Sequence, residues 1–403
     1  MSDMEYKKFS TFIDSVQYGY TADETSTVEG DAKYLRITDI VPYFVDKDRV
    51  PFCKISDKNR IKYLVTENDL LIARTGATTG YNLIVPKGFD NYVFASYLVR
   101  FNYNQDELYP QYLKHVLKSQ QYYGFVKNYI GGSAQPGMNP KAFGRFEVPH
   151  VEYDKQKRIA EILSAYDDLI ENNNRRIALL EKAAQELYKE WFVRFRYPGY
   201  ENAKFENGLP AGWNVKRLAD YGKVETGKTP STEVLENYGC EIMFVKTPDM
   251  HGNLFTIQTG EYLSKQGHLT QPKKLLPPNS IMVSCIGTGG VVSINAEQAH
   301  TNQQINSIIL DNSMFLEWLF FTCKALKETI ELFGAIGATM TNLSKGKFEK
   351  LKVIEPQAEL ITLFHDKVYP IFDEIKALMY NNKNLAKQRD LFLPRLMSGK
   401  LEV

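Results

Sequence analysis

The sequence predicts an α+β fold in which two pseudo-repeated α+β domains are separated by two long helices packed as an antiparallel coiled coil. Three observations support this prediction. Two segments carry a thin apolar stripe at heptad spacing, each stripe follows a stretch of strand-like segments and turns, and these features recur after about 205 to 211 residues. A chain of 403 residues has room for two or three domains.

The first domain is expected to mix strands with a helix. Short segments rich in apolar and β-branched residues are bounded by glycine, proline and asparagine, which is typical of strands separated by turns. A polar, glycine-rich loop is expected at 130–139, between the helix and the last strand. The expected strands are 34–40, 69–74, 81–85, 94–102 and 146–149, and the expected helix is 109–122.

A long helix is expected next, because apolar residues recur at alternating steps of four and three between Asp154 and Phe195. Its other faces are charged, which disfavours the alternative of a fully buried bundle helix and requires a partner for the stripe. A second stripe near the end of the chain supplies that partner, with Arg389 as its charged interruption. The seam positions are Ile159, Leu163, Tyr166, Ile170, Ile177, Leu180 and Leu187 in the first helix and Ile371, Ile375, Leu378, Leu385 and Phe392 in the second.

Each helix also carries a pattern that predicts a break. Ser164 and Asp167 have the spacing of a capping box, and Pro370 is tolerated in the first turn of a helix but not inside one. Each uninterrupted piece would then have about 25 residues and a length of about 40 Å. Asn173 and Asn382 fall on the stripes, where they either set the register of the helices or lie exposed near the breaks.

The second half repeats the features of the first in the same order. The segment 34–40 returns at 244–250, and the segment 68–80 returns at 279–290. A linker rich in proline and glycine separates the copies. The expected boundaries are 1–152 for the first domain, 153–195 for the first long helix, 196–212 for the linker, 213–356 for the second domain and 357–403 for the second long helix.

The composition is that of an ordinary globular chain. Hydrophobic residues make up 43% and charged residues 24%, and no run approaches the about 18 apolar residues of a membrane span. The four cysteines are scattered without a Cys-x-x-Cys pair, which fits a reducing cytoplasm and argues against a zinc site. Because the formal net charge is only +1, any nucleic-acid surface must be local.

Residues 222–229 match the phosphate-loop pattern G-x-x-x-x-G-K-T, so a nucleotide hydrolase is one alternative. A phosphate loop follows a buried strand and opens a helix, whereas no apolar strand precedes Gly222 and Pro230 follows the motif directly. The sequence also lacks an Asn/Asp-Pro-Pro-aromatic methyltransferase loop, a convincing set of acidic nuclease ligands and histidines at metal-ligand spacing. No catalytic and no metal-binding residue is therefore expected.

The loops between the strands carry side chains suited to reading DNA. Arg74 offers a bidentate donor of the kind that guanine accepts, and the threonines after it offer hydroxyl groups to phosphates or base edges. Each residue alone is better explained as an ordinary loop residue, so the prediction rests on the clusters. The candidates are Arg74, Thr75, Thr78, Thr79, Ser133, Gln135, Asn139 and Lys141 in the first half and Lys246, Thr288, Gln303, Gln304, Thr339, Thr341, Asn342 and Lys345 in the second.

The order of domain, long helix, linker, domain and long helix resembles the specificity subunit of type I restriction–modification enzymes. The resemblance covers the whole chain and is most specific in KRIAEILSAYDDLIENNNRRIALLEKAAQELYKEWFVRF (157–195), NGLPAGW (207–213) and RDLFLPRLMSGKL (389–401). DLLIARTGATTG (69–80) resembles the target-recognition domains of that family. The second copy departs from this pattern, because Cys285-Ile286-Gly287 stands in place of Arg-Thr-Gly.

The resemblance implies a cytoplasmic DNA-binding subunit without an active site. Each domain would be a target-recognition domain that reads one half of a bipartite double-stranded DNA target, and the helices would set the spacer and dock two methyltransferase subunits. The chain itself would bind no cofactor, since S-adenosylmethionine, ATP and magnesium would belong to the methyltransferase and to the restriction (motor) subunits. A coiled-coil adaptor without DNA binding is the remaining alternative.

Overall fold

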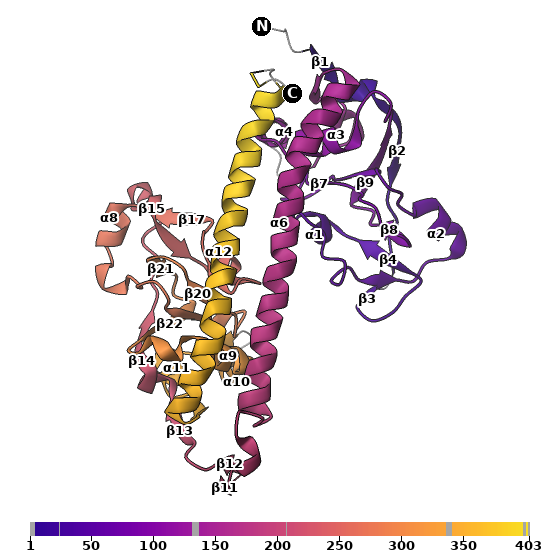
Figure 1. Cartoon of the computed structure of the whole chain (residues 1–403). Coiled ribbons are helices and arrows are strands. Elements are labelled where there is room, and N and C mark those ends of the chain that lie inside the picture. The colour runs from indigo at the N-terminus through magenta and orange to yellow at the C-terminus, as the bar shows by residue number, and fades with distance from the viewer. Residues whose placement is uncertain are drawn as a thin grey trace. The chain divides into compact units, whose positions relative to one another are not determined.

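Two compact units make up the fold, and each combines one domain with parts of both long helices. The structure is a computed structural model and describes residues 5–23, 25–130, 137–206, 208–335, 341–397 and 400–401. Unit 1 comprises residues 1–172 and 383–403, and unit 2 comprises residues 173–382. The long helices α6 (Tyr153–Tyr188) and α12 (Ala358–Met397) each contribute to both units (Figure 1).

The domain of unit 1 is built on two four-stranded sheets and a two-stranded ribbon. Its strands are β1 (Glu5–Lys8), β2 (Ile13–Tyr18), β3 (Thr25–Ser26), β4 (Ala32–Leu35), β5 (Phe52–Cys53), β6 (Leu70–Ala73), β7 (Asn82–Ile84), β8 (Tyr92–Phe94), β9 (Leu98–Tyr103) and β10 (Glu147–His150). Its short helices are α1 (Ile37–Ile40), α2 (Asp57–Tyr63), α3 (Pro110–Val116), α4 (Gln120–Ile130) and α5 (Pro140–Phe143). The strand orders are β2-β9-β6-β7, β3-β5-β4-β8 and β1-β10, and the buried β6 lies inside the first sheet.

The domain of unit 2 is built in the same way on a five-stranded and a three-stranded sheet. Its strands are β13 (Asn214–Arg217), β14 (Gly222–Thr226), β15 (Tyr238–Val245), β16 (Phe255–Thr256), β17 (Glu261–Leu263), β18 (Ile281–Ser284), β19 (Ile286–Gly287), β20 (Val292–Asn295), β21 (Ala299–Thr301), β22 (Ile305–Leu310), β23 (Thr341–Asn342) and β24 (Lys352–Glu355). Its helices are α7 (Thr247–Met250), α8 (Lys265–Leu269), α9 (Leu316–Ala325), α10 (Lys327–Ala335) and α11 (Lys345–Glu349). The main strand orders are β14-β22-β18-β20-β16 and β17-β15-β21, and β11 (Phe205–Glu206) pairs with β12 (Leu209–Pro210) in the linker.

The internal repeat predicted from the sequence is confirmed strand by strand. The order β14-β22-β18-β20 reproduces β2-β9-β6-β7, and the ribbon β13-β24 reproduces β1-β10. Even a local cap is repeated. The Arg36 backbone N–H donates to the Asp39 carboxylate, and the Lys246 backbone N–H donates to the Asp249 carboxylate, at the starts of α1 and α7.

The long helices α6 and α12 pack antiparallel within each unit, as predicted. In unit 1, Ile159 and Leu163 share a core with Leu393 and Leu396. In unit 2, the ring centroids of Tyr188 and Phe364 lie 6.3 Å apart, and Asn173 Nδ2 donates to Asn382 Oδ1 at 2.9 Å. Residues later in α6 therefore contact residues earlier in α12, as expected for antiparallel helices. The two seam asparagines pair with each other, and Asn173 is buried rather than exposed.

The predicted helix breaks are wrong, because both helices are continuous through them. Ser164 and Asp167 lie inside α6, where Asp167 binds tertiary partners rather than a helix end. Pro370 lies inside α12 and is exposed, while the buried Val368 and Phe372 hold the helix on either side of it. The helices of 36 and 40 residues are about 54 and 60 Å long at 1.5 Å per residue.

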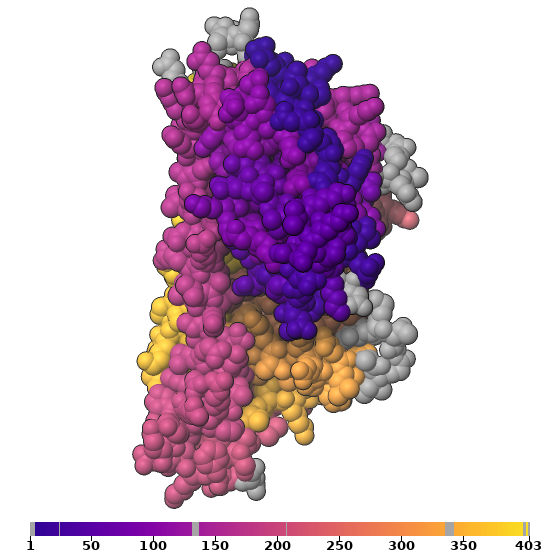
Figure 2. All heavy atoms as spheres, turned by 90° about the vertical axis from the view of Figure 1, so that its right-hand side faces the viewer, coloured from indigo at the N-terminus to yellow at the C-terminus, as the bar shows by residue number. Residues whose placement is uncertain are grey.

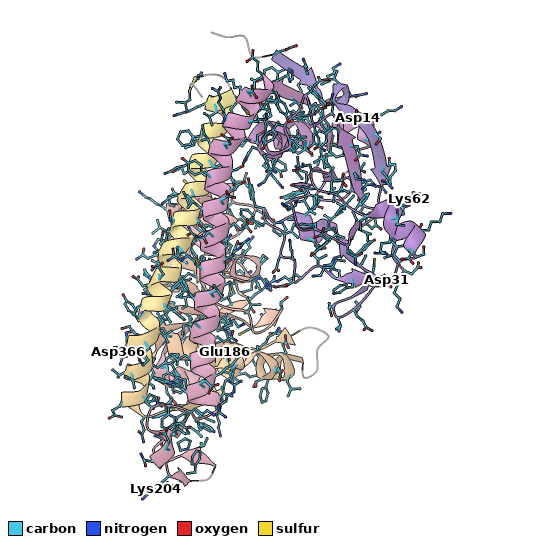
Figure 3. All side chains as sticks on the ribbon, turned by 45° about the vertical axis from the view of Figure 1, so that its right-hand side comes forward. Asp14, Asp31, Lys62, Glu186, Lys204 and Asp366 are labelled. Carbon is cyan, nitrogen blue, oxygen red and sulfur yellow. The ribbon has the colours of Figure 1, made fainter. Side chains whose placement is uncertain are left out.

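The buried stripe of each helix is wider than the predicted seam, since each helix also packs on a domain. A five-residue π-helical segment, Lys189–Val193, extends α6 and carries the buried Trp191 and Phe192. The seam predictions divide into a buried group (Ile159, Leu163, Ile170, Ile375 and Leu378) and a half-buried group (Tyr166, Ile177, Leu180, Leu187, Ile371, Leu385 and Phe392). The other faces are mostly polar, with single exposed apolar residues such as Leu179 and Leu391, and Figure 3 labels Glu186 on α6 and Asp366 on α12.

Three expected elements of the first domain are shorter than predicted. The segment 34–40 leaves the strand β4 after Leu35 and turns into α1. The segment 94–102 contains the end of β8 and most of β9, and the segment 109–122 contains α3 and the start of α4. Hydrophobic pattern alone did not show these turns, because the residues on both sides of each turn are buried in the same domain core.

The domain of unit 1 lies against the first half of α6, as the space-filling view shows (Figure 2). Lys114 of α3 reaches Asp167 of α6 at 2.8 Å. Within the described ranges, no helix is long and apolar enough to cross a membrane. The same part of the chain contains no group of three histidine, cysteine or acidic side chains arranged to hold a metal ion.

Candidate nucleic-acid interface

One end of the sheet β2-β9-β6-β7 in unit 1 gathers four loops into a continuous surface. Backbone hydrogen bonds run from Gly19 N to Leu98 O (3.2 Å), from Arg74 N to Tyr97 O (3.1 Å) and from Met138 N to Arg74 O (2.9 Å). Thr75 and Gly137 form an isolated bridge between two of these loops. The two polar clusters predicted in the first half therefore meet. We call this region loop surface 1, comprising Tyr18, Arg74, Thr75, Ser96, Tyr97 and Gly137.

Loop surface 1 presents aromatic rings around a half-buried arginine. Tyr18 is 49% exposed and Tyr97 is 58% exposed, although tyrosine is normally more buried. Arg74 Nε donates to the Ser96 carbonyl oxygen at 3.3 Å, and Arg74 Cζ lies 5.1 Å from the centroid of the Tyr18 ring. Stacking rings beside a fixed guanidinium provide both apolar contact and hydrogen-bond donors for a base.

The other candidates in the first half have different positions. Thr79 is buried, and its hydroxyl donates to the Gly76 carbonyl oxygen at 2.7 Å, so that it stabilises the turn. The Asn139 side chain accepts from Ala142 N as the cap of α5. Thr78 is half-buried and Lys141 is exposed. Ser133 and Gln135 lie outside the described residues.

Unit 2 forms the corresponding surface with the same backbone pattern. Hydrogen bonds run from Gly227 N to Ile305 O (3.2 Å), from Cys285 N to Gln304 O (2.7 Å) and from Leu343 N to Cys285 O (2.9 Å). A Cβ at Gly19 would lie 2.1 Å from the Ala95 carbonyl oxygen, and one at Gly227 would lie 2.2 Å from the Asn302 carbonyl oxygen. Both copies therefore require glycine at this close approach. We call the region loop surface 2, comprising Lys228, Thr229, Ile286, Gln303, Gln304 and Asn342.

Loop surface 2 has amides and a lysine in place of the tyrosines and arginine. The Thr229 hydroxyl donates to Gln303 Oε1 at 2.6 Å, and Asn302 Nδ2 donates to Gln304 Oε1 at 3.1 Å. Lys228 is exposed. Cys285, at the position of Arg74, is buried, and burial raises the pKa of its thiol to about 11. The equivalent position in unit 2 is thus an uncharged core residue.

The remaining candidates of the second half are spread more widely. Lys246 forms an ion pair with Glu261, and Lys345 lies 3.6 Å from Glu349. Thr288 is exposed at the turn after β19. Thr341 belongs to the backbone pairing of β23 with β19, and Thr339 lies outside the described residues.

The phosphate-loop geometry is absent from residues 222–229. Gly222–Thr226 is the strand β14, paired with β22, and residues 227–230 form no helix. In a phosphate loop, residues 222–226 would form the turn and the residues from 227 onward would begin a helix. The lysine of the motif, Lys228, instead joins loop surface 2, at the position that corresponds to Tyr20 in the repeat.

Sequence reasoning missed Tyr18 and Tyr97 of unit 1 and Lys228 and Thr229 of unit 2. A usable signal exists in the repeat itself. The pairs Gly19/Gly227 and Leu98/Ile305 are equivalent in the structure, and each missed residue lies within two residues of one of these positions. Composition did not reveal them, because tyrosine and threonine are also ordinary strand residues.

Comparisons with known proteins agree with this architecture. The family model described as type I restriction modification DNA specificity domain matches residues 2–182 and 210–362. The chain is 30% identical to the type I restriction enzyme HindI specificity subunit of Haemophilus influenzae, over 87% of this chain and 91% of that protein. It is 27% identical to the MjaIX specificity subunit of Methanocaldococcus jannaschii, over 74% of this chain and 71% of that protein.

A solved structure shares the fold. The S subunit of a type I restriction–modification system from M. genitalium superposes with a TM-score of 0.56 at 15% identity, covering 98% of this chain and 97% of that one. At this identity the likeness supports the fold, whereas the family model and the relative at 30% identity support membership. The chain therefore belongs to the family of type I restriction–modification specificity subunits.

Proposed function

We propose that this chain is the non-catalytic specificity subunit of a type I complex in which each unit reads one half of a bipartite double-stranded DNA target. The observation that carries the proposal is the duplicated loop surface. Each unit presents one at the same end of the same sheet, and the exposed side chains differ while the backbone frame is kept. A repeated frame with different exposed side chains is what reading two different half-targets requires.

The chemistry of the two surfaces suits base edges more than dense phosphate binding. Loop surface 1 offers Tyr18, Arg74 and Tyr97 to base edges. Loop surface 2 offers Gln303 and Gln304 to base edges and Lys228 to a phosphate. With a formal net charge of +1, the chain has no large excess of positive charge to attract the DNA backbone. We expect modest DNA affinity alone and stronger, salt-dependent binding when methyltransferase subunits add phosphate contacts.

The long helices are proposed to set the spacer between the half-targets. Their continuity supports this role, since helices of 36 and 40 residues reach about 54 and 60 Å against about 34–36 Å for one turn of B-DNA. The charged outer faces of α6 and α12 are proposed to dock two methyltransferase subunits. The division at 1–152, 153–195, 196–212, 213–356 and 357–403 belongs to this proposal.

The chemistry of the complex is assigned to partners. Methyltransferase subunits would bind S-adenosylmethionine, and restriction subunits would bind ATP and magnesium. A cytoplasmic complex is proposed, because the DNA target and these cofactors are there.

A domain exchange tests whether each unit recognises its own half of the DNA target independently. Residues 1–152 are replaced by the corresponding domain of another specificity subunit, the chain is expressed with its methyltransferase, and the methylated motif is sequenced. One half of the motif should change while the other half and the spacer stay. A change in both halves, or in neither, would contradict the proposal.

A helix insertion tests the spacer role. Seven residues added to both α6 and α12 near the Asn173–Asn382 pair preserve the heptad register. The half-targets should stay the same, and the spacer should lengthen or assembly should fail. An unchanged spacer in an assembled complex would contradict the proposed role of the helices.

The two alternatives have direct tests. Magnesium-dependent ATP hydrolysis by the purified chain that disappears in Lys228→Ala would favour the nucleotide hydrolase. The absence of any footprint on DNA in the presence of the methyltransferase would favour the adaptor.

A further inference from the structure

We propose that Arg74 reads a guanine in the half-target bound by unit 1, and that Tyr18 and the Ser96 carbonyl hold its guanidinium in the reading position. This inference rests on the proposed function and adds a base and a positioning residue to it. Among the described residues, Arg74 lacks a carboxylate partner, keeps Nη donors that no acceptor uses, and is held in place by Tyr18 and the Ser96 carbonyl.

The charge of Arg74 has no carboxylate partner among the described residues. The comparable arginines of unit 1 have one each, since Arg100 pairs with Asp69 at 3.0 Å and Arg389 pairs with Asp167 at 2.7 Å. A half-buried guanidinium without a counter-charge keeps its donors and its charge available to a ligand.

The donor inventory leaves one edge of the guanidinium for a ligand. Arginine has five N–H donors in a planar fork, and Nε of Arg74 is used by the Ser96 carbonyl oxygen at 3.3 Å. Neither Nη atom has an acceptor in the described part of the chain. Two parallel donors on one edge match the O6 and N7 acceptors of guanine in the major groove.

The position of the side chain favours a base over a phosphate. Tyr18, whose ring centroid is 5.1 Å from Arg74 Cζ, and the Ser96 carbonyl already restrict the guanidinium, so little side-chain entropy is left to lose on binding. Phosphate oxygens are also met by flexible, exposed lysines such as Lys228. A preorganised fork flanked by exposed rings is better suited to a flat base edge.

The contrast with unit 2 makes the inference specific. The backbone of Cys285 occupies the same place, because Cys285 N donates to Gln304 O as Arg74 N donates to Tyr97 O. The Cys285 side chain is buried and offers no donor fork. The guanine contact is therefore a property of one half-target and not of both.

The test is the base preference of the complex formed with the methyltransferase. Arg74→Gln should lower discrimination at one guanine of the unit 1 half-target by roughly 5- to 150-fold and leave all other positions unchanged. Tyr18→Leu should relax the same position more weakly, and Tyr18→Phe, which keeps the ring, should retain the preference. Arg49→Gln, which removes an exposed arginine of the same unit, is the matched control.

Each outcome separates the possibilities. A uniform loss of methylation with an unchanged motif would assign Arg74 to a phosphate and overturn the inference, as would an unchanged motif at full activity. If Arg74→Gln gives no active complex, wild-type complex is tested on duplexes with 7-deazaguanine, which lacks N7, at each guanine of the half-target in turn. Weaker binding at one guanine supports the inference, and equal binding at all of them overturns it. Failure of the wild-type complex to give any bipartite motif would instead refute the proposed function.

Discussion

The two units contain copies of one repeated domain, and each copy is attached to the helices α6 and α12 by different contacts. In unit 1 the buried carboxylate of Asp167 accepts hydrogen bonds from Tyr43 Oη at 2.8 Å, Lys114 Nζ at 2.8 Å and an Arg389 Nη at 2.7 Å. In unit 2 the junction is aromatic. Between ring centroids, Phe372 of α12 lies 5.6 Å from Phe320 of α9, and Tyr188 of α6 lies 5.4 Å from Phe321 of α9. Phe364 of α12 joins the two helices in the same core, 5.8 Å from Trp191. Both junctions also contain contacts of the other kind, since Leu393 and Leu396 pack in the core of unit 1 and His365 of α12 meets the buried Glu317 of α9 at 2.7 Å in unit 2. The difference is that unit 1 gathers several donors on one buried carboxylate, whereas unit 2 gathers aromatic rings.

The difference shows why a charged residue interrupts the second stripe. Burial alone would raise the pKa of Asp167, but Lys114, His115 and Arg389 outweigh burial and lower it. Arg389 on α12 thus completes a charge network with α6 and the domain, and it also lies 4.2 Å from the centroid of the Tyr43 ring. Such a network defines a geometry more strictly than apolar packing does, and it is more sensitive to the loss of one member.

The largest effect is expected from emptying the aromatic junction. Phe364→Ala removes a fully buried ring and should lower the free energy of unfolding of unit 2 by about 3–5 kcal/mol. Trp191, Trp213 and Trp318, the three tryptophans of the chain, all lie in unit 2, so tryptophan fluorescence during denaturation reports on this unit. The control Leu363→Ala, at a partly exposed neighbouring residue, should change the free energy of unfolding of unit 2 by less than about 1 kcal/mol. Similar losses of stability in both variants would contradict the prediction that the buried aromatic ring of Phe364 stabilises unit 2.

A slightly smaller effect is expected in unit 1 from Arg389→Met. The variant leaves Asp167 buried with fewer donors and should destabilise unit 1 by about 3 kcal/mol. Hydrogen exchange of the unit 1 amides measures the effect, while tryptophan fluorescence should stay close to wild type. The control is Arg176→Met, which breaks the exposed pair with Glu374 between the same helices and should change stability by less than about 0.5 kcal/mol. Equal exchange in the two variants would refute the special role of the network.

Acid should act on the polar junction through His115. Burial lowers the pKa of His115 from 6.5 to about 3, so its neutral form contributes stability that is complete above pH 6.5 and is lost progressively as the pH falls toward 3. Between pH 7.5 and 5.5 the loss is about 1.4 kcal/mol. His115→Gln should reduce the pH dependence of unit 1 by this amount, measured by urea denaturation at both pH values. The exposed His251 offers the control His251→Gln, and an unchanged pH dependence in His115→Gln would contradict the assignment.

The smallest effect concerns the loop surfaces. Lys228→Ala should weaken DNA binding of the complex equally for all sequences and reduce the salt slope by about 1, the value for one phosphate contact. Lys223→Ala, on the strand β14 that precedes Lys228, removes a lysine that is paired with Glu225 at 2.9 Å and should leave the slope unchanged. A change in the bases preferred in one half-target would show that Lys228 reads a base instead.

Much of the fold could be predicted, because periodicity and repetition are carried by many residues at once. The stripes of α6 and α12 extend over several heptads, and the repeat is supported by separated pairs such as Gly76 and Gly287. These two glycines have φ of 79° and 78°, a conformation that other residues rarely adopt. A pattern supported at many positions survives an error at any one of them.

The details that failed depend on tertiary partners. The sequence alone does not show whether Asp167 caps the start of a helix or binds partners from other elements. The structure decides this, because Tyr43, Lys114 and Arg389 surround the carboxylate. Pro370 has the same ambiguity, because packing on both sides offsets its missing hydrogen bond. The candidate site residues also divide into some that the sequence predicted and others that only the structure showed. Arg74 was identified by its chemistry, whereas Tyr18 is recognisable only once the sheet brings β2 beside β9.

The sharing of both helices between the units has a consequence for biosynthesis. Unit 2 is one uninterrupted stretch of chain, whereas unit 1 needs residues 383–397, which leave the ribosome after every residue of unit 2. Until then Asp167 has no guanidinium beside it, and the core around Ile159 lacks Leu393 and Leu396. The first-made part of the protein is thus the last to mature, and a prematurely released chain displays an open core to quality-control proteases.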